Sequence, residues 1–337
     1  MKLFFYSVKD FEKQEIEKQQ IKGFEVKLSK VKLTPDSAVL ASGYDGISVF
    51  TDDDVSAATI EKLHQMKIKC IAIRATGYDN IDREAAALHD IPVYNVPDYS
   101  PVSIAEHSLL LMLALSRKLK RSQELMQTLD FSIDELIGET ISGKTIGIVG
   151  TGKIGKSLIA LLSGFNVRIL AHDIKPDPRL ALKKNIFYTS IEVLCANSDI
   201  ISLHLPLDED SHHLIDHPLM QLMKENALII NTARGAIIDT DDLIDNLKTG
   251  KIAGAALDVY EFEKGIFFYN HHFDGIKDER LKTLLAMKNV VITPHQAFAT
   301  HQSLSKIAAV TFHNFYCFNK KMKSGNEIKA TIQLMSA

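Results

Sequence analysis

The chain has 337 residues, of which 46% are hydrophobic and 24% are charged, and its formal net charge is -3 at pH 7. A chain of this length favours two domains, because a single hydrophobic core stops growing at roughly 250–300 residues. The slightly negative charge excludes the basic surface that nucleic acids or anionic membranes require. We therefore expect neither as a partner.

The N-terminus carries a short apolar run, residues 1–6, followed by charged residues. It lacks the long apolar stretch and the small-residue cleavage site of a signal peptide, and we expect it to form a first β-strand. The most apolar helical segment, residues 109–115, is far shorter than the ~20 residues that span a bilayer. These features predict a soluble, cytoplasmic protein.

Short apolar runs alternate with helical patterns along the chain, which indicates βαβ units on parallel sheets. Most runs are apolar without alternation, as expected when helices cover both faces of a sheet. The predicted strands are residues 68–75, 145–149, 167–171, 200–205, 227–231, 252–257 and 290–293.

The sequence pattern predicts helices in three segments. The first begins at Ser103, which can form a capping box with Glu106, and runs to about Lys120; its apolar surface predicts burial at a domain or subunit interface. The second follows Thr240 and ends at Gly250, a residue suited to the position after a helix. A third spans about residues 300–321 and can pack back on the N-terminal domain, which would make that domain discontinuous.

The cysteines and paired histidines predict no metal site. Cys70, Cys195 and Cys317 are scattered without the spacing of metal ligands, which is typical of thiols in a reducing compartment. Two pairs of adjacent histidines occur, His212-His213 and His271-His272. Neighbouring residues point apart on a helix or a strand, so we expect neither pair to chelate a metal.

A glycine-rich turn, Gly150-Thr151-Gly152-Lys153-Ile154-Gly155, follows the strand at 145–149 and precedes a helical pattern. This strand–turn–helix context is the one in which such a turn binds a dinucleotide. Gly150 permits the tight turn, Gly152 lets the backbone approach a pyrophosphate, and Gly155 lets helix and strand pack closely. The amides of the helix N-terminus then face the phosphates.

Asp173 lies 23 residues after Gly150, at the end of the next predicted strand. An acid at this position can accept hydrogen bonds from both hydroxyls of an adenosine ribose and repels a 2′-phosphate. The sequence therefore favours NAD over NADP, although Lys175 lies close by and leaves the preference less strict.

An arginine and a histidine follow two further predicted strands. Arg234, in Asn231-Thr232-Ala233-Arg234-Gly235, can hold a substrate carboxylate through two parallel hydrogen bonds. His295 can exchange a proton near neutral pH if a carboxylate lies against it, since that neighbour raises the imidazole pKa and fixes its tautomer. Glu263 is the candidate partner, and spacing alone leaves Asp258 and Glu261 open as alternatives.

In these blocks the chain resembles the D-isomer-specific 2-hydroxyacid dehydrogenases, and within them the fermentative D-lactate dehydrogenases. The resemblance covers essentially the whole chain. It rests on residues 74–82 (Arg-Ala-Thr-Gly-Tyr-Asp-Asn-Ile-Asp), 95–101 (Asn-Val-Pro-Asp-Tyr-Ser-Pro), 105–107 (Ala-Glu-His), 150–155, 203–206 (Leu-His-Leu-Pro), 231–235, 258–263 (Asp-Val-Tyr-Glu-Phe-Glu) and 293–298.

The resemblance implies an α/β fold of two Rossmann-like, doubly wound domains with parallel sheets and the active site in the cleft between them. Residues 1–100 and 299–337 would form the substrate domain, and residues 101–298 the NAD-binding domain. It also implies a homodimer or homotetramer. The family's catalytic triad falls on Arg234, Glu263 and His295.

Further contacts follow from the resemblance alone. The substrate would be bound by the amides of Thr76 and Gly77, by Tyr99, and by Phe298, together with Arg234 and His295. The cofactor, NAD or NADH, would be bound by the glycine turn with Lys153 and Ile154, by Asp173, and by His204, Pro206, Thr232 and Asp258, the last at the nicotinamide amide.

The segment 258–268 is similar to the lactate dehydrogenases, whereas phosphoglycerate and glycerate dehydrogenases show a proline-rich ending there. The expected reaction is reversible NADH-dependent reduction of pyruvate to D-lactate, with His295 as proton donor. Two alternatives stay open: a D-2-hydroxyisocaproate-type dehydrogenase with a larger pocket, and an NAD-sensing protein similar to the C-terminal-binding-protein co-repressors.

Overall fold

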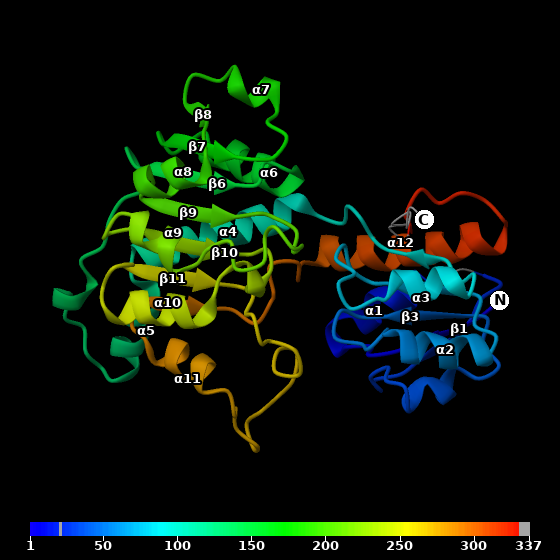
Figure 1. Cartoon of the computed structure of the whole chain (residues 1–337). Helices are drawn as coiled ribbons and strands as arrows, with labels where there is room; N and C mark the ends of the chain where they lie inside the picture. Colours follow the sequence, from blue (N-terminus) through cyan, green and yellow to red (C-terminus); the bar gives the residue numbers. More distant parts are fainter. Residues whose placement is uncertain (20–21, 330–337) are drawn as a thin grey trace. The chain divides into compact units, whose positions relative to one another are not determined.

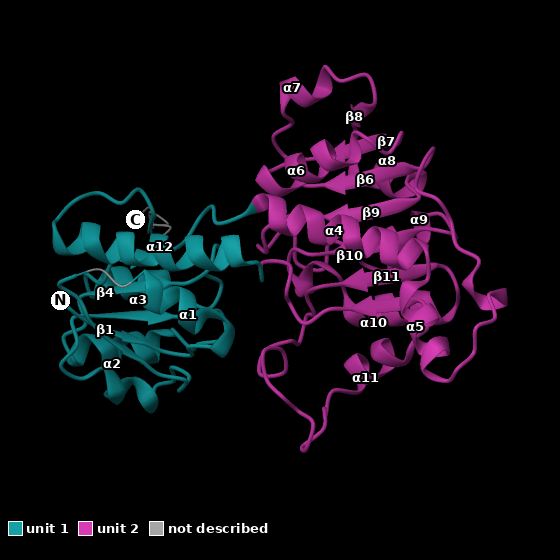
Figure 2. Cartoon of the chain, turned by 180° about the vertical axis from the view of Figure 1, so that it is seen from behind, with its two compact units in different colours: residues 1–100, 299–337 teal, residues 101–298 magenta. Residues whose placement is uncertain are grey.

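The computed structural model describes residues 1–19 and 22–329 (Figure 1). The chain divides into two compact units (Figure 2). Unit 1 consists of Met1–Ser100 and Ala299–Ala337, and unit 2 of Pro101–Phe298. Each unit is a parallel or mostly parallel sheet with helices on both faces, so the predicted α/β class with two doubly wound domains is confirmed.

Unit 1 contains a six-stranded sheet in the order β13-β5-β4-β3-β1-β2, parallel except for β13, which pairs antiparallel with β5. Its strands are β1 (Lys2–Phe5), β2 (Glu25–Leu28), β3 (Gly46–Val49), β4 (Cys70–Ile73), β5 (Val93–Tyr94) and β13 (Glu327–Ile328). Its helices are α1 (Asp10–Lys18), α2 (Ala57–Gln65), α3 (Arg83–Leu88), α12 (His301–Asn319) and the 3-10 helix η1 (Ser37–Ala41). Helices α2 and α3 pack on one face, and α1 and α12 on the other.

Arg74 follows β4 directly and is the largest fully buried side chain of unit 1. Its guanidinium forms a two-pronged ion pair with Glu12, at 2.9 Å for each bond, and also donates to Ser48 Oγ and the carbonyl of Tyr6. A buried charge is tolerated when its donors are paired in this way. Arg74 therefore fixes the chain where it leaves the sheet towards Thr76.

Unit 2 contains seven strands, all parallel, in the order β12-β11-β10-β9-β6-β7-β8. The strands are β6 (Thr145–Val149), β7 (Arg168–His172), β8 (Ile186–Tyr188), β9 (Ile200–Leu203), β10 (Leu228–Asn231), β11 (Gly254–Leu257) and β12 (Val290–Ile292). The helices are α4 (Pro101–Ser116), α5 (Leu119–Gln127), α6 (Lys153–Leu162), α7 (Pro178–Ala181), α8 (Ile191–Asn197), α9 (His217–Leu222), α10 (Thr240–Lys248), α11 (Glu279–Ala286) and the 3-10 helices η2 (Asp134–Leu136) and η3 (Gly235–Ile237).

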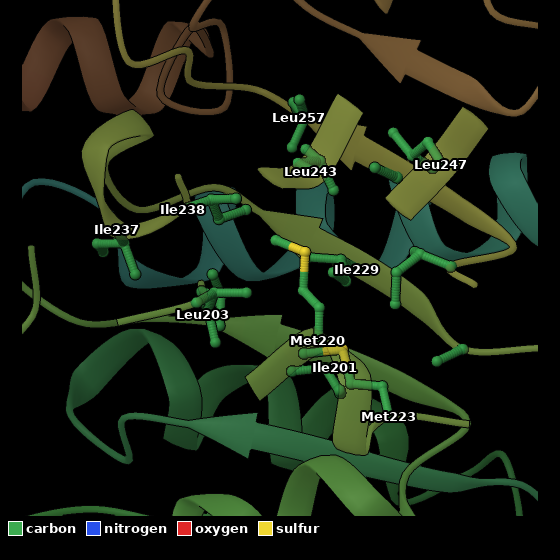
Figure 3. Packing of buried hydrophobic residues seen from close by; sticks show 14 of the residues in the cluster. Ile201, Leu203, Met220, Met223, Ile229, Ile237, Ile238, Leu243, Leu247 and Leu257 are labelled. Atoms are coloured by element: carbon green, nitrogen blue, oxygen red, sulfur yellow. The ribbon is translucent and has the colours of Figure 1, made fainter. Parts of the chain in front are cut away.

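The side chains of unit 2 form two cores, one on each face of the sheet. Helices α4 and α6 cover one face, and helices α8 to α11 cover the other. Figure 3 shows the second core, where Ile201 of β9 and Ile229 of β10 lie against Met220 of α9. Each such side chain contributes roughly 1.5–3 kcal/mol relative to exposure, so this packing fixes the strand ends that carry the polar residues described below.

The first predicted helix differs from the expectation at both ends. Helix α4 begins at Pro101, a residue suited to a first turn because its φ is fixed and it lacks an N–H. Ser103 is therefore not an N-cap, and its hydroxyl instead donates to the carbonyl of Ala297 at 2.6 Å. The helix ends at Ser116, and Lys118 takes a left-handed φ of 52° before α5 begins. The segment that sequence predicted as one helix is thus two.

All three cysteines are buried: Cys70 and Cys317 in unit 1, and Cys195 in unit 2. Burial raises the pKa of the Cys195 thiol to about 12 and also raises that of Cys70. Neither of these two thiols is therefore an ionised nucleophile at neutral pH. Among residues 1–19 and 22–329, no helix has both the length and the apolar character needed to cross a membrane.

Candidate active site

The predicted site residues of unit 2 follow the carboxyl ends of six neighbouring strands, β12, β11, β10, β9, β6 and β7. The order of the sheet reverses between β6 and β9, because β7 and β8 extend to one side and β9 to β12 to the other. In open α/β sheets, ligands bind outside the carboxyl ends at such a reversal point. The glycine turn follows β6 and His204 follows β9, so both lie at this point.

Two glycines of the turn are required by the fold itself. Gly150 has a φ of +93°, and a Cβ there would lie 2.5 Å from the carbonyl oxygen of His204. At Gly155, a Cβ would lie 2.1 Å from the carbonyl oxygen of Gly150. These contacts explain the predicted roles of a tight turn and a close approach of helix to strand.

Gly152 is different, because nothing in the fold requires a glycine there. Its φ is -65°, which any residue adopts, and a Cβ would meet no atom within 4 Å. It is also the N-cap of α6 and has no side chain to bond the first-turn amides. Open space over the backbone beside an uncapped helix N-terminus is what the approach of a pyrophosphate needs.

Asp173 lies directly after β7 and contacts the glycine turn. Its Oδ2 accepts from the amide of Thr151 at 2.6 Å and from the Thr151 hydroxyl at 2.8 Å, and its Oδ1 accepts from the amide of Lys175. Burial raises the pKa of this carboxyl, but these hydrogen bonds outweigh burial and hold it below its usual value. Asp173 is therefore an ionised acceptor placed beside the turn.

The sequence did not predict the link from Asp173 to Thr151, nor the Tyr188 hydroxyl that donates to Thr151 Oγ1 at 2.9 Å. Tyr188 ends β8, next to β7 in the sheet. The only feature of the sequence that could have identified Tyr188 is its position at the end of a strand next to the one that precedes Asp173.

His204 supplies a polar atom without a partner at the reversal point. Its Nε2 lies 2.9 Å from the hydroxyl of Ser202, while its Nδ1 is buried and has no hydrogen-bond partner among the described residues. Burial lowers the pKa of His204 to about 4, so the ring is neutral at pH 7. A buried polar atom that lacks a partner is costly, and a polar ligand at the turn would relieve that cost.

The other predicted cofactor residues lie along the same edge of the sheet. The Thr232 hydroxyl lies 2.7 Å from that of Ser108 on α4, and Pro206 is exposed, with its carbonyl accepting from Ser211. Lys153 is exposed and Ile154 half-buried in the first turn of α6. With the open space at Gly152 and the orphaned nitrogen of His204, these residues fit a dinucleotide.

His295 and Glu263 form a direct pair. The Nδ1 of His295 lies 2.6 Å from Glu263 Oε1. The other carboxylate oxygen, Oε2, accepts from the amide of Tyr260 at 2.9 Å, so the turn that carries the glutamate also orients it. This arrangement leaves Nε2 of His295 as the nitrogen available to a substrate.

The environment of His295 favours its protonated form. Burial lowers the pKa of His295, but the charge and hydrogen bond of Glu263, together with the charge of Asp258, outweigh burial and raise it above its usual value. The positive charge of Arg234 acts in the opposite direction. A raised pKa keeps a proton on the imidazole near neutral pH, which suits a general acid.

The two alternative partners that sequence left open have other contacts. Glu261 binds His213, with 2.7 Å between Oε1 and Nε2. Asp258 is fully buried, and its carboxylate accepts from the Thr293 hydroxyl and from the amides of Gln296 and Ala297. Asp258 therefore organises the chain around His295, and its proposed contact with a nicotinamide amide stays a prediction.

His107 on α4 is a polar neighbour that sequence reasoning did not assign. Its Nε2 lies 3.2 Å from Asp258 Oδ1 and 3.1 Å from the hydroxyl of Thr293. The signal that could have identified it is a histidine in an otherwise apolar helix, since a buried imidazole needs a polar partner.

Arg234 follows β10 in a loop whose shape depends on its neighbours. The amide side chain of Asn231 donates to the Arg234 carbonyl at 2.8 Å. A Cβ at Gly235 would lie 2.1 Å from the backbone of Tyr260, so glycine permits this loop to close against the turn that carries Glu263. The guanidinium also lowers the pKa of His295 electrostatically, so its charge acts on the imidazole that Glu263 contacts.

Aromatic rings surround the imidazole. The ring of Phe298 lies 6.3 Å from that of His295 and is nearly perpendicular to it, and Phe268 lies at 5.6 Å. The predicted substrate residues Thr76, Gly77 and Tyr99 belong to unit 1. There the Thr76 hydroxyl donates to the carbonyl of Val96 at 2.8 Å. The roles of these three residues stay predictions.

The expectation that adjacent histidine side chains point apart is wrong for His212 and His213. Their rings stack with centroids 4.0 Å apart and planes 29° apart. The rule that adjacent side chains point apart holds for helices and strands, but His213 has a left-handed φ of 51°. This backbone turn brings the two rings to the same side of the chain.

Comparison with known proteins agrees with this geometry. Residues 109–297 match the model of the D-isomer specific 2-hydroxyacid dehydrogenase NAD binding domain. D-lactate dehydrogenase of Escherichia coli is 37% identical over 97% of this chain and 100% of its own length, and an aromatic 2-oxoacid reductase of Clostridium sporogenes is 40% identical over 87% and 88%. The structure of the pyruvate reductase of Chlamydomonas reinhardtii superposes with a TM-score of 0.90 at 35% identity, over 97% of this chain and 98% of the other.

Proposed function

The chain belongs to the D-isomer specific 2-hydroxyacid dehydrogenases, and we propose that within this family it reduces pyruvate to D-lactate in a reversible reaction. It is an oxidoreductase whose cofactor is NAD(H). The observation that carries the proposal is the 2.6 Å pair of His295 and Glu263, with Arg234 close by at the edge of the sheet where the dinucleotide turn lies.

The first step assigned to the protein is to hold the keto acid. Arg234 binds the carboxylate of pyruvate through two parallel hydrogen bonds, which fix both position and orientation. The keto oxygen then lies at Nε2 of His295, since Nδ1 is occupied by Glu263. Carboxylate and keto oxygen together fix the plane of the substrate, so that one face of the carbonyl is presented to the cofactor, the face that gives the D product.

Bound NADH supplies the hydride that the carbonyl carbon accepts. As negative charge develops on the keto oxygen, protonated His295 donates its Nε2 proton to that oxygen, and the product alcohol is complete. Glu263 stabilises the imidazolium before the transfer and keeps the remaining proton on Nδ1 afterwards. In the reverse direction, the neutral imidazole accepts the hydroxyl proton of lactate.

Pyruvate is favoured by the likeness to D-lactate dehydrogenase and to a pyruvate reductase over nearly the whole chain. The rings of Phe268 and Phe298 lie beside that of His295 and would limit the space around a substrate bound there, which supports a small substrate. A second candidate is a bulkier 2-keto acid. The likeness to an aromatic 2-oxoacid reductase supports this candidate. The two candidates share the mechanism and differ only in the side chain of the substrate.

The test is the initial rate of NADH oxidation with pyruvate, 2-ketoisocaproate and phenylpyruvate, with the chirality of the product assayed. The highest kcat/KM with pyruvate, and D-lactate as the product, would support the proposal. A preference for one of the bulkier acids would replace pyruvate as substrate. NADH binding without turnover of any of them would favour an NAD-sensing role and overturn the enzymatic proposal.

We also propose a homo-oligomer, a dimer or tetramer. The support is a run of exposed apolar side chains between α5 and β6, including Leu129, Phe131, Ile133 and Ile137, each at least 67% exposed. Several large apolar side chains exposed along one segment are typical of a protein interface. Light scattering on the purified chain gives its mass, and a monomer at micromolar concentration would contradict this proposal.

A further inference from the structure

A cluster of three metal-ligating side chains lies outside the groups assigned to the reaction. His212 and His213 lie between β9 and α9, and Glu261 lies between β11 and α11. One ligand atom from each of the three residues lies within 4.8 Å of the other two. The left-handed φ of His213 and the bond from its amide to the carbonyl of Ala236, at 2.8 Å, hold the two rings side by side.

The cluster is open to solvent on one side and anchored on the other. His212 is exposed, whereas the side chain of Glu261 is only 11% exposed. Its Oε1 lies 2.7 Å from His213 Nε2, and its Oε2 accepts from the amide of Thr240 at 3.2 Å. An ion could therefore reach the site, while its carboxylate ligand, Glu261, is already held in place.

Asp239 orients the second imidazole. Its Oδ2 lies 3.2 Å from Nδ1 of His213, on the opposite side of the ring from Glu261. A carboxylate on the outer nitrogen is the usual partner of a metal-binding histidine, since it fixes the tautomer that leaves the other nitrogen free to bind. Asp239 is itself fixed, because its Oδ1 caps α10 by accepting from the amide of Asp242.

We propose that His212, His213 and Glu261 form a binding site for a divalent transition-metal ion of the Zn²⁺ type. Two imidazoles and one carboxylate are ligands that suit Zn²⁺ and its neighbours, whereas Mg²⁺ and Ca²⁺ prefer oxygen ligands alone. Three protein ligands leave a further position for water. The ion would replace the hydrogen bond between His213 and Glu261.

The site would connect to the proposed active site through the backbone. Glu261 lies within the turn from Tyr260 to Glu263, whose amide and carboxylate contacts orient the partner of His295. A bound ion would tie this turn to the loop at residues 208–213. The site is nevertheless distinct from the pair of His295 and Glu263, because the ring of His213 contacts Glu261 and Asp239 instead.

The test is calorimetric titration of ZnCl₂ into the tag-free chain, with Co²⁺ absorption in the visible range as a spectroscopic readout. We expect saturable binding of one ion per chain. The variants His212→Gln and Glu261→Gln should weaken binding about tenfold or more, because each removes a ligand. Asp239→Asn should weaken it about 10–100-fold as an outer partner, while asparagine preserves the helix cap.

The matched control is His272→Gln in the other adjacent pair. His271 there bonds the carbonyl of Ile266, and the ring of His272 packs against Phe273. This variant should bind Zn²⁺ as the wild type does. Since all three cysteines are buried, thiolates do not compete for the ion.

His212→Gln should also keep its metal-free turnover and melting temperature, since His212 is exposed and outside the catalytic groups. The proposal is overturned if the wild-type chain shows no saturable Zn²⁺ binding. It is equally overturned if His212→Gln binds as tightly as the wild type, or if His272→Gln loses as much affinity as His212→Gln does.

Discussion

The backbone N–H of His295 donates to the carbonyl of Asp258 across 2.7 Å, which joins the ends of β11 and β12. The Asp258 carboxylate then accepts from the next two amides, those of Gln296 and Ala297. His295 has a left-handed φ of 53°, a conformation that costs free energy in a residue other than glycine. The bonds to Asp258 stabilise this conformation, so the position of the imidazole depends on a residue 37 positions earlier in the chain.

Asp258→Asn should therefore lower both stability and kcat. Asparagine offers one acceptor oxygen instead of two, and at least one of the buried groups that Asp258 now satisfies loses its partner. We expect a loss of about 1–3 kcal/mol in the free energy of unfolding, measured by urea denaturation. The control is Asp274→Asn, at an exposed position. Wild-type stability and kcat in Asp258→Asn would contradict the structural role.

His295→Gln should lower kcat for pyruvate reduction by roughly 10²–10⁴ if His295 is the proton donor. Glutamine can still hydrogen-bond the keto oxygen but has no proton to give. NADH binding, followed by fluorescence titration, should remain at the wild-type value. A variant that keeps wild-type kcat would remove His295 from the reaction.

Glu263→Gln should move the pH profile. Burial lowers the pKa of His295 and Glu263 outweighs it, so loss of the carboxylate lowers that pKa. Reduction needs the imidazolium, and its kcat/KM falls as pH rises through the pKa of His295. The fall should therefore begin at a lower pH in the variant, and superimposable profiles would disprove the coupling.

The same pair links pH to stability. The pKa of His295 is raised in the folded state, so its contribution to stability is present below the unfolded-state pKa and is lost as pH rises through the folded-state pKa. Urea denaturation of the wild type and of Glu263→Gln should therefore be measured from below the unfolded-state pKa of His295 to above its folded-state pKa. The free energy of unfolding should fall over this pH range only in the wild type.

Arg234→Lys should reduce kcat/KM for pyruvate by about 10–100-fold, because a charged hydrogen bond contributes roughly 1.5–3 kcal/mol and a lysine cannot reproduce the planar pair. The loss should fall mainly on the keto acid and leave the Kd for NADH unchanged. Steady-state kinetics with both ligands varied make the distinction. A normal KM and kcat for pyruvate would argue against the carboxylate contact.

Gly152→Ala and Gly155→Ala form a matched pair that separates cofactor binding from folding. The first adds a methyl group where no atom lies within 4 Å, and the second places one 2.1 Å from the Gly150 carbonyl oxygen. Gly155→Ala should destabilise the chain by about 1–3 kcal/mol through overpacking. Gly152→Ala should melt as the wild type does and bind NADH more weakly, and unchanged NADH affinity would mean that no pyrophosphate approaches Gly152.

The buried strands were predictable because their apolar runs do not alternate. β6 occupies the predicted residues, 145–149. The predicted strands at 68 and 252 begin too early, since Ile68 and Ile252 are buried in the cores but precede the paired residues of β4 and β11. An apolar run indicates burial, and hydrogen-bond pairing covers only part of the buried segment.

The parts of the site that depend on consecutive residues could be predicted from the sequence. The parts that depend on backbone conformation could not. The glycine turn and its strand and helix could be recognised from consecutive residues. Three other features depend on left-handed residues or on contacts between distant segments. They are the choice among three acids for His295, the cap at Ser103 and the stacking of His212 on His213. The resemblance identified Glu263 correctly as the neighbour of His295, and spacing could not have done so.

Because the cysteines are buried, their chemical modification can be used to detect local unfolding of the chain. Cys70 packs in a core of unit 1, where Cys317 of α12 is also buried, and Cys195 packs in a core of unit 2. A covered thiol reacts with an alkylating reagent only when the structure around it opens. Each modified cysteine in a native chain therefore records which of the two units has unfolded locally, without any introduced label.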